Sequence, residues 1–136
     1  LMADGSSRVT VLVSAAGPLS NFAVAILAAV SFFILQAVAP AAPGHYESFF
    51  RPLLLVALFS VAVNVSLGIF NLVPIPPLDG FGVVESFAPA RWIRGVMWVR
   101  RYGFVFLVVA IFTGALSAVL RPPMTLVFQL LLGGPS

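Results

Sequence analysis

The sequence predicts an all-α membrane protein with about three transmembrane helices, additional interfacial helices and a proline-rich loop at membrane depth. Residues of the AVILMFWYC set make up 61% of the 136 positions, charged residues make up 8%, and the mean hydropathy is +1.13. A soluble domain carries roughly 25% charged residues. Apolar runs of bilayer length also recur along the chain. The composition excludes a soluble globular protein and, because disorder requires low hydrophobicity and high charge, a disordered chain.

Several site chemistries are excluded by residues that the sequence lacks. Cysteine is absent and His45 is the single histidine. The chain alone therefore cannot build a disulfide scaffold, a Cys-ligated cluster or a site with two histidine ligands. The basic residues flank apolar blocks and form no run, and the net charge is +3. This pattern is typical of anchoring at a membrane interface, and we expect no nucleic-acid partner.

The first two predicted spans are residues 18–38 and 52–72 of what we interpret as a single membrane domain, 1–136. Pro18 suits the first turn of a helix, and each segment is long enough for about one bilayer thickness. A turn-rich polar loop separates them. The second span ends in the segment VPIPPLDG, residues 73–80, where three prolines remove helix donors and impose extended backbone.

The rest of the chain is expected to hold one more span and two surface segments. Residues 81–101 are predicted to lie at the membrane interface, because basic and indole side chains alternate there. The third span is 102–120, and the apolar run 124–132 is too short to cross, so it is expected to lie on the bilayer or re-enter it. The interfacial side chains are Arg91, Trp92, Arg94, Trp98, Arg100 and Arg101.

Three crossings would place the N-terminus and the segment 73–101 on the same side of the membrane. That side collects most of the arginines, so the positive-inside rule puts the loop with Asp79 at the cytoplasmic face. His45 would lie on the opposite face. The N-terminus lacks the basic, apolar and cleavage pattern of a signal peptide.

Asp79 is a candidate functional residue because it is a charged side chain next to an uncharged predicted span. A carboxylate at mid-bilayer costs about 2.5 to 3.5 kcal/mol, so it should pair, coordinate a cation or face water. The alternative is an interfacial Asp-Gly turn. Asn71 can donate hydrogen bonds to carbonyls freed by the prolines, although a polar stripe with Asn64 is also compatible with helix packing. Glu85 is expected to pair with an interfacial arginine rather than act as a base.

Three segments of the chain resemble the site-2 protease family of intramembrane zinc metalloproteases. The segment NLVPIPPLDG, residues 71–80, resembles the family's aspartate motif. The segment AGPLSN, residues 16–21, is similar to the family's Gly-x-x-x-Asn element at the start of a core helix. The segment RYGF, residues 101–104, followed by an apolar span, is similar to small bacterial members. The resemblance covers most of the chain, with its motifs in the family's order.

The resemblance implies roles for four residues. In the family this motif places an aspartate in the membrane as the third zinc ligand. The resemblance assigns that role to Asp79. Asn71 matches an asparagine that contacts substrate. Gly17 and Asn21 match the element beside the substrate path. The resemblance also implies a bacterial inner membrane location and a membrane-spanning protein as substrate.

The other half of such a zinc site is absent from the sequence. The family's H-E-x-x-H helix supplies two histidine ligands and the glutamate base, and it would precede residue 1. No H-E-x-x-H occurs here, and His45 is predicted on the face opposite Asp79. Because catalytic zinc normally has three protein ligands, we expect this chain alone to bind none.

Two functions are compatible with these observations. In the first, the chain works with the missing helices, from its own or another polypeptide, in proteolysis within the membrane. In the second, it is a catalytically inactive homologue that serves as a structural subunit of a larger membrane complex. Both require the lipid bilayer and further membrane protein segments as partners.

Overall fold

The computed structural model describes residues 5–134, and every element in that range is helical. The prediction of an all-α chain is confirmed. Short helical turns cover Ala39–Ala41, Pro43–His45, Tyr46–Phe50 and Ala90–Trp92. The longer helices are α1 (Gly5–Val38), α2 (Arg51–Asn71), α3 (Asp79–Phe87), α4 (Ile93–Thr113) and α5 (Ala115–Leu132). Of the domain predicted over 1–136, residues 1–4 and 135–136 lie outside the described range.

Four helical segments in the described range are long and apolar enough to cross a membrane, against about three predicted. They are Gly5–Ala41, Pro43–Asn71, Ala90–Thr113 and Ala115–Leu132. Their outward side chains are largely apolar, with Phe112 87% exposed and Leu130 76% exposed. Such a surface would aggregate in water and is solvated by lipid tails, so the chain is a membrane protein.

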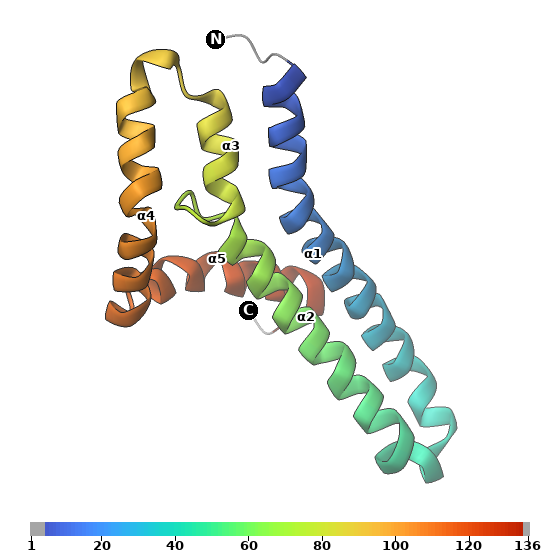
Figure 1. The fold of residues 1–136 in the computed structure, drawn as a ribbon. Helices are drawn as coiled ribbons and strands as arrows, with labels where there is room; N and C mark the ends of the chain where they lie inside the picture. The colour runs from blue at the N-terminus through green and yellow to red at the C-terminus, as the bar shows by residue number, and fades with distance from the viewer. Residues whose placement is uncertain (1–4, 135–136) are drawn as a thin grey trace.

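Helices α1 and α2 form a long hairpin, and their contact holds most of the packed core (Figure 1). Ala25 on α1 and both Val61 and Val65 on α2 are completely buried. Nearer the loop, an added Cβ on Gly68 would lie 2.9 Å from the Phe22 ring, so α2 presents bare backbone to that ring. In lipid, close packing of this kind is what holds helices together, because hydrophobic transfer contributes little.

The start of α1 differs from the prediction. The helix begins at Gly5, so Pro18 lies inside it and not in its first turn. At 1.5 Å per residue its 34 residues extend about 50 Å, well beyond the roughly 30 Å of a hydrocarbon core. The added first part packs against α3, where an added Cβ on Gly82 would lie 2.3 Å from Ser14 Oγ. The helix α1 therefore continues on both sides of Pro18, and a proline inside a membrane helix is tolerated.

Alongside α1, the segment α2, loop and α3 behaves as one interrupted helix. Figure 1 shows α2 following the second part of α1, α3 following the first part, and the loop lying between them. The break falls where the prolines predicted it, after Asn71. The loop consequently lies at a level part-way along α1, between the part of α1 that packs on α2 and the part that packs on α3.

The C-terminal third also differs from the prediction. The expected interfacial segment 81–101 is divided among α3, the turn Ala90–Trp92 and the first part of α4. The expected span 102–120 is interrupted at Gly114, whose φ of +78° is left-handed and ends α4. The run 124–132 is not an isolated short segment, because α5 continues through Pro122 and Pro123.

Helix α5 crosses the bundle steeply relative to α4 and passes beneath the end of α2 (Figure 1). Leu116 and Leu120 are buried, and Met124, Val127 and Leu131 continue the same face against the core. These positions recur every three or four residues, which places them on one side of a helix. Helix α5 therefore covers the lower side of the proline-rich loop.

Candidate functional site

The loop between α2 and α3, residues 72–78, satisfies its own backbone donors. Its four N–H groups that are not proline come from Leu72, Val73, Ile75 and Leu78. They donate to the carbonyls of Ile69, Phe70, Val73 and Ile75 respectively, over 2.9 to 3.1 Å. The loop is ordered by local hydrogen bonds and needs no side chain to hold its donors, which are costly to leave unpaired in lipid.

Asp79 is the first residue of α3, and its side chain faces α1. It is half-buried, and an added Cβ on Gly17 would lie 2.6 Å from Asp79 Oδ2. Any residue but glycine at position 17 would therefore displace the carboxylate. The helix N-terminus favours a negative charge at this position. Within residues 5–134 the Asp79 carboxylate has no hydrogen-bond or ion-pair partner, so its oxygens remain available as ligands.

Two further glycines, Gly80 in α3 and Gly103 in α4, let their helices approach the loop before Asp79 closely. An added Cβ on Gly80 would lie 2.1 Å from the Leu72 carbonyl oxygen, so the start of α3 rests directly on the loop. An added Cβ on Gly103 would lie 2.6 Å from Pro76 Cδ, which brings α4 against the other side of the loop. Reasoning from sequence missed Gly80, because an Asp-Gly pair indicates a turn and carries no sign of a tight backbone contact.

The two predicted asparagines have different surroundings. Asn71 donates from Nδ2 to the Leu67 carbonyl at 2.9 Å, within its own helix. The expectation that it holds the loop carbonyls is wrong, because this nearer acceptor is already in reach of the amide. Asn21 lies one helical turn after Gly17 and is half-buried. No hydrogen bond joins either asparagine to Asp79 across the described residues, so of the predicted set the structure brings together Gly17 and Asp79.

The donor set for a metal is incomplete within the described part of the chain. No three His, Asp or Glu side chains gather there as a metal site. His45 belongs to the connection between α1 and α2, which lies at the opposite end of the molecule from the α3–α4 connection (Figure 1). The chemistry of Asp79 fits one oxygen ligand of a zinc ion, and the remaining ligands must come from other residues.

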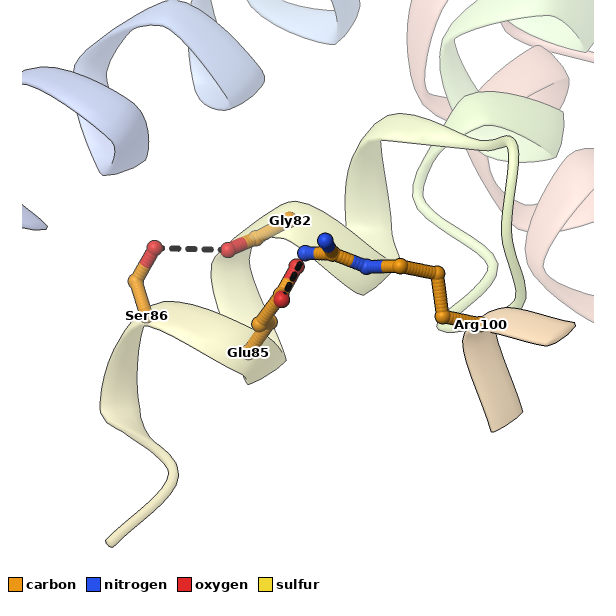
Figure 2. Close-up of polar contacts among 4 residues, drawn as sticks. All are labelled: Gly82, Glu85, Ser86 and Arg100. Carbon is orange, nitrogen blue, oxygen red and sulfur yellow. Dashed lines mark hydrogen bonds and ion pairs between the residues drawn. The ribbon is translucent and has the colours of Figure 1, made fainter. Parts of the chain in front are cut away.

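An ion pair fixes α4 to α3 beside the site. Arg100 donates from a guanidinium nitrogen to Glu85 Oε1, as Figure 2 shows. The Glu85 side chain is only 29% exposed, so this pair is partly shielded from solvent. On the neighbouring turn Ser86 Oγ donates to the Gly82 carbonyl at 2.7 Å. The prediction that Glu85 serves an interfacial arginine is confirmed.

Comparison with known proteins identifies two curated relatives. The chain is 35% identical over 112 residues to "Putative zinc metalloprotease YwhC" of Bacillus subtilis, covering 82% of this chain and 50% of that protein. It is 28% identical over 116 residues to "Putative zinc metalloprotease Rip2" of Mycolicibacterium smegmatis, covering 82% of this chain and 39% of that protein. The chain thus spans half or less of the length of these relatives.

No protein-family model matches the chain, and no solved structure matches it. The names of the two relatives, both putative zinc metalloproteases, agree with the family that the motifs around Gly17 and Asp79 resemble. On these observations the chain belongs to the site-2 protease family, as part of the core without an H-E-x-x-H helix.

Proposed function

We propose that this chain supplies the aspartate half of an intramembrane zinc protease that hydrolyses membrane-spanning proteins. The observation that supports this most is the Asp79 carboxylate, which faces glycine backbone at the break in the α2–α3 segment and has no partner within residues 5–134. A carboxylate with no structural partner at membrane depth indicates a functional role. The names of the two relatives supply the metal and the reaction class.

In this proposal Asp79 is the third protein ligand of the zinc ion, and two histidines and a glutamate base come from the family's H-E-x-x-H helix. A bound zinc would polarise the peptide carbonyl and acidify a water molecule. The chain's own part is to hold the carboxylate. Gly17 leaves space for it on the α1 side, and Gly80 seats the start of α3 on the loop.

Asn71 and Asn21 are proposed to lie along the substrate path. An extended substrate strand offers unpaired N–H and C=O groups, which an amide side chain can both accept from and donate to. Asn71 donates one hydrogen bond to the Leu67 carbonyl, and its own side-chain oxygen is left for a contact with substrate. We further propose that the site opens toward the cytoplasm from a bacterial inner membrane, because most arginines lie at the α3–α4 end of the chain.

The test uses a chimera in which this chain replaces the matching segment of the Bacillus subtilis relative. Zinc content and cleavage of a membrane-spanning substrate are measured on the purified protein. Asp79→Asn should reduce bound zinc from about one per molecule and remove cleavage, because a neutral amide is a poor zinc ligand. The matched control is Glu47→Gln, which removes the carboxylate paired with Arg51 at the other end of the molecule.

Unchanged zinc content and cleavage in Asp79→Asn would refute the proposal. A chimera that assembles but neither binds zinc nor cleaves would favour the structural-subunit function instead. Gly17→Ala gives a second, graded test. The added methyl displaces the carboxylate without removing it, so zinc affinity and cleavage should fall by about 10-fold to 100-fold, the range seen when ligand positioning is disturbed.

A further inference from the structure

The outward face of the first part of α4 carries a cluster of basic and aromatic side chains. Arg94, Trp98 and Arg101 recur at intervals of four and three residues, which places them on one side of the helix. Tyr102 adjoins them, and Trp98 and Tyr102 are 53% and 40% exposed. Helix α4 contacts α5 and the loop on its other side, so this face is turned away from the bundle.

Three side chains of this cluster, those of Trp98, Arg101 and Tyr102, line a shallow hollow of about 420 Å³, and Arg94 lies outside its lining. The rings of Trp98 and Tyr102 are 5.3 Å apart between centroids, and the Arg101 guanidinium lies 5.5 Å from the Tyr102 ring centre. Cation–π contact of this kind orients a guanidinium while leaving its N–H donors unused. The hollow is lined by Met97, Trp98, Arg100, Arg101 and Tyr102.

The charges around the hollow are not balanced. Arg100 is neutralised by Glu85 on α3. The described range contains two further acidic residues, Glu47, which pairs with Arg51, and Asp79, which has no ion pair. Neither Arg94 nor Arg101 therefore has an ion-pair partner among residues 5–134. Two uncompensated positive charges remain on the face that is turned away from the bundle.

Below the hollow the same side of α4 becomes purely apolar. Trp98 packs on Phe106 with ring centroids 5.7 Å apart, and Val105, Phe106 and Val109 are each more than half exposed. Along the helix, cations and aromatic rings are therefore interleaved in the order Arg94, Trp98, Arg101 and Tyr102, and exposed hydrocarbon follows them. A phospholipid has the complementary order, because its charged headgroup precedes its acyl chains, and indole and phenol side chains favour the headgroup level.

We infer that the face formed by Arg94, Trp98, Arg101 and Tyr102 binds one anionic phospholipid, with the phosphate between the two guanidinium groups and the acyl chains along Phe106 and Val109. Arginine binds phosphate oxygens through paired N–H donors, and the second positive charge favours a lipid with net negative charge over a zwitterionic one. This proposal is independent of zinc and of proteolysis, since it uses neither the Asp79 carboxylate nor a residue that contacts it.

The test measures thermal unfolding of the full chain in a neutral maltoside detergent with added phosphatidylglycerol, added phosphatidylcholine or glycerol phosphate. Phosphatidylglycerol should raise the unfolding midpoint more than phosphatidylcholine at equal concentration, and glycerol phosphate should not raise it. The double variant Arg94→Gln/Arg101→Gln should lose the preference for phosphatidylglycerol. Both side chains are exposed, so the variant should fold normally in the absence of lipid.

Arg51→Gln is the matched control, because Arg51 is an exposed arginine at the opposite end of the molecule. It should keep the full preference for phosphatidylglycerol. Native mass spectrometry provides an independent count, and it should show one retained phosphatidylglycerol on the unmodified chain and none on the double variant. Equal stabilisation by the two lipids, or an equal loss of preference in Arg51→Gln, would overturn the inference, as would a full response to glycerol phosphate.

Discussion

Replacing Gly80 with alanine tests whether α3 rests directly on the loop backbone. The added Cβ would lie 2.1 Å from the Leu72 carbonyl oxygen and 2.7 Å from the Val73 carbonyl oxygen. Ordinary contact begins near 3.4 Å, so α3 and the loop must separate by about 1.3 Å. Overpacking that forces a backbone shift costs about 1 to 3 kcal/mol, and a contact this short belongs at the upper end. Alanine returns up to about 1 kcal/mol of helix propensity. We therefore expect Gly80→Ala to reduce the free energy of unfolding by about 2 kcal/mol.

Gly95→Ala is the matched control for this substitution. Gly95 lies inside α4, and an added Cβ there meets nothing within 4 Å. The same residue change should therefore stabilise the chain by up to about 1 kcal/mol. Reversible unfolding in detergent, followed by helical circular dichroism, measures both variants against the unmodified chain. A difference of less than about 1 kcal/mol between Gly80→Ala and Gly95→Ala would refute the tight contact between α3 and the loop.

Three further predictions concern the surroundings of the site. A double-mutant cycle between Glu85→Gln and Arg100→Gln, measured by the same unfolding assay, should give a coupling of about 0.2 to 1 kcal/mol, because Arg100 is largely exposed; zero coupling would remove the ion pair as a link between α3 and α4. Asn71→Leu should cost about 1 kcal/mol or less, because its amide bonds only within α2; a loss above about 2 kcal/mol would show that the amide holds the loop instead. Single cysteines at His45 and Ala90, introduced into this cysteine-free chain, should react with an impermeant thiol reagent from opposite sides of the membrane; labelling from one side would contradict the proposed topology.

Composition and proline positions were sufficient to predict the helical class and the break that precedes Asp79. Apolar runs predicted helices, and consecutive prolines predicted where the second one ends, because both signals act locally on the backbone. The same reasoning gave the pairing of Glu85 with an arginine, since four arginines follow this carboxylate in the expected interfacial segment. The motif resemblance, rather than geometry, singled out Gly17 before its contact with Asp79 was known.

Features that depend on packing could not be predicted in this way. Hydropathy does not distinguish Gly114 from its apolar neighbours, yet its left-handed φ divides the run 102–120 between two helices. Prolines 18, 122 and 123 read as helix boundaries but lie inside helices, where Pro18 is buried and Pro122 and Pro123 are exposed. The sequence also does not indicate the close approach of Gly80 to the loop, because this contact joins two residues that are predicted to belong to separate elements.

The local hydrogen bonds of the proline-rich loop have a consequence for how the chain enters a membrane. Each donor from Leu72 to Leu78 finds its acceptor two or three residues earlier, as does the N–H of Phe81 at 3.2 Å. An unpaired donor in hydrocarbon costs several kcal/mol, and none of these five donors depends on a later helix for its partner. The interrupted segment can therefore leave the insertion machinery already folded along its own backbone. Contacts of α4 and α5 with the loop add to a break whose named donors are already paired within the segment.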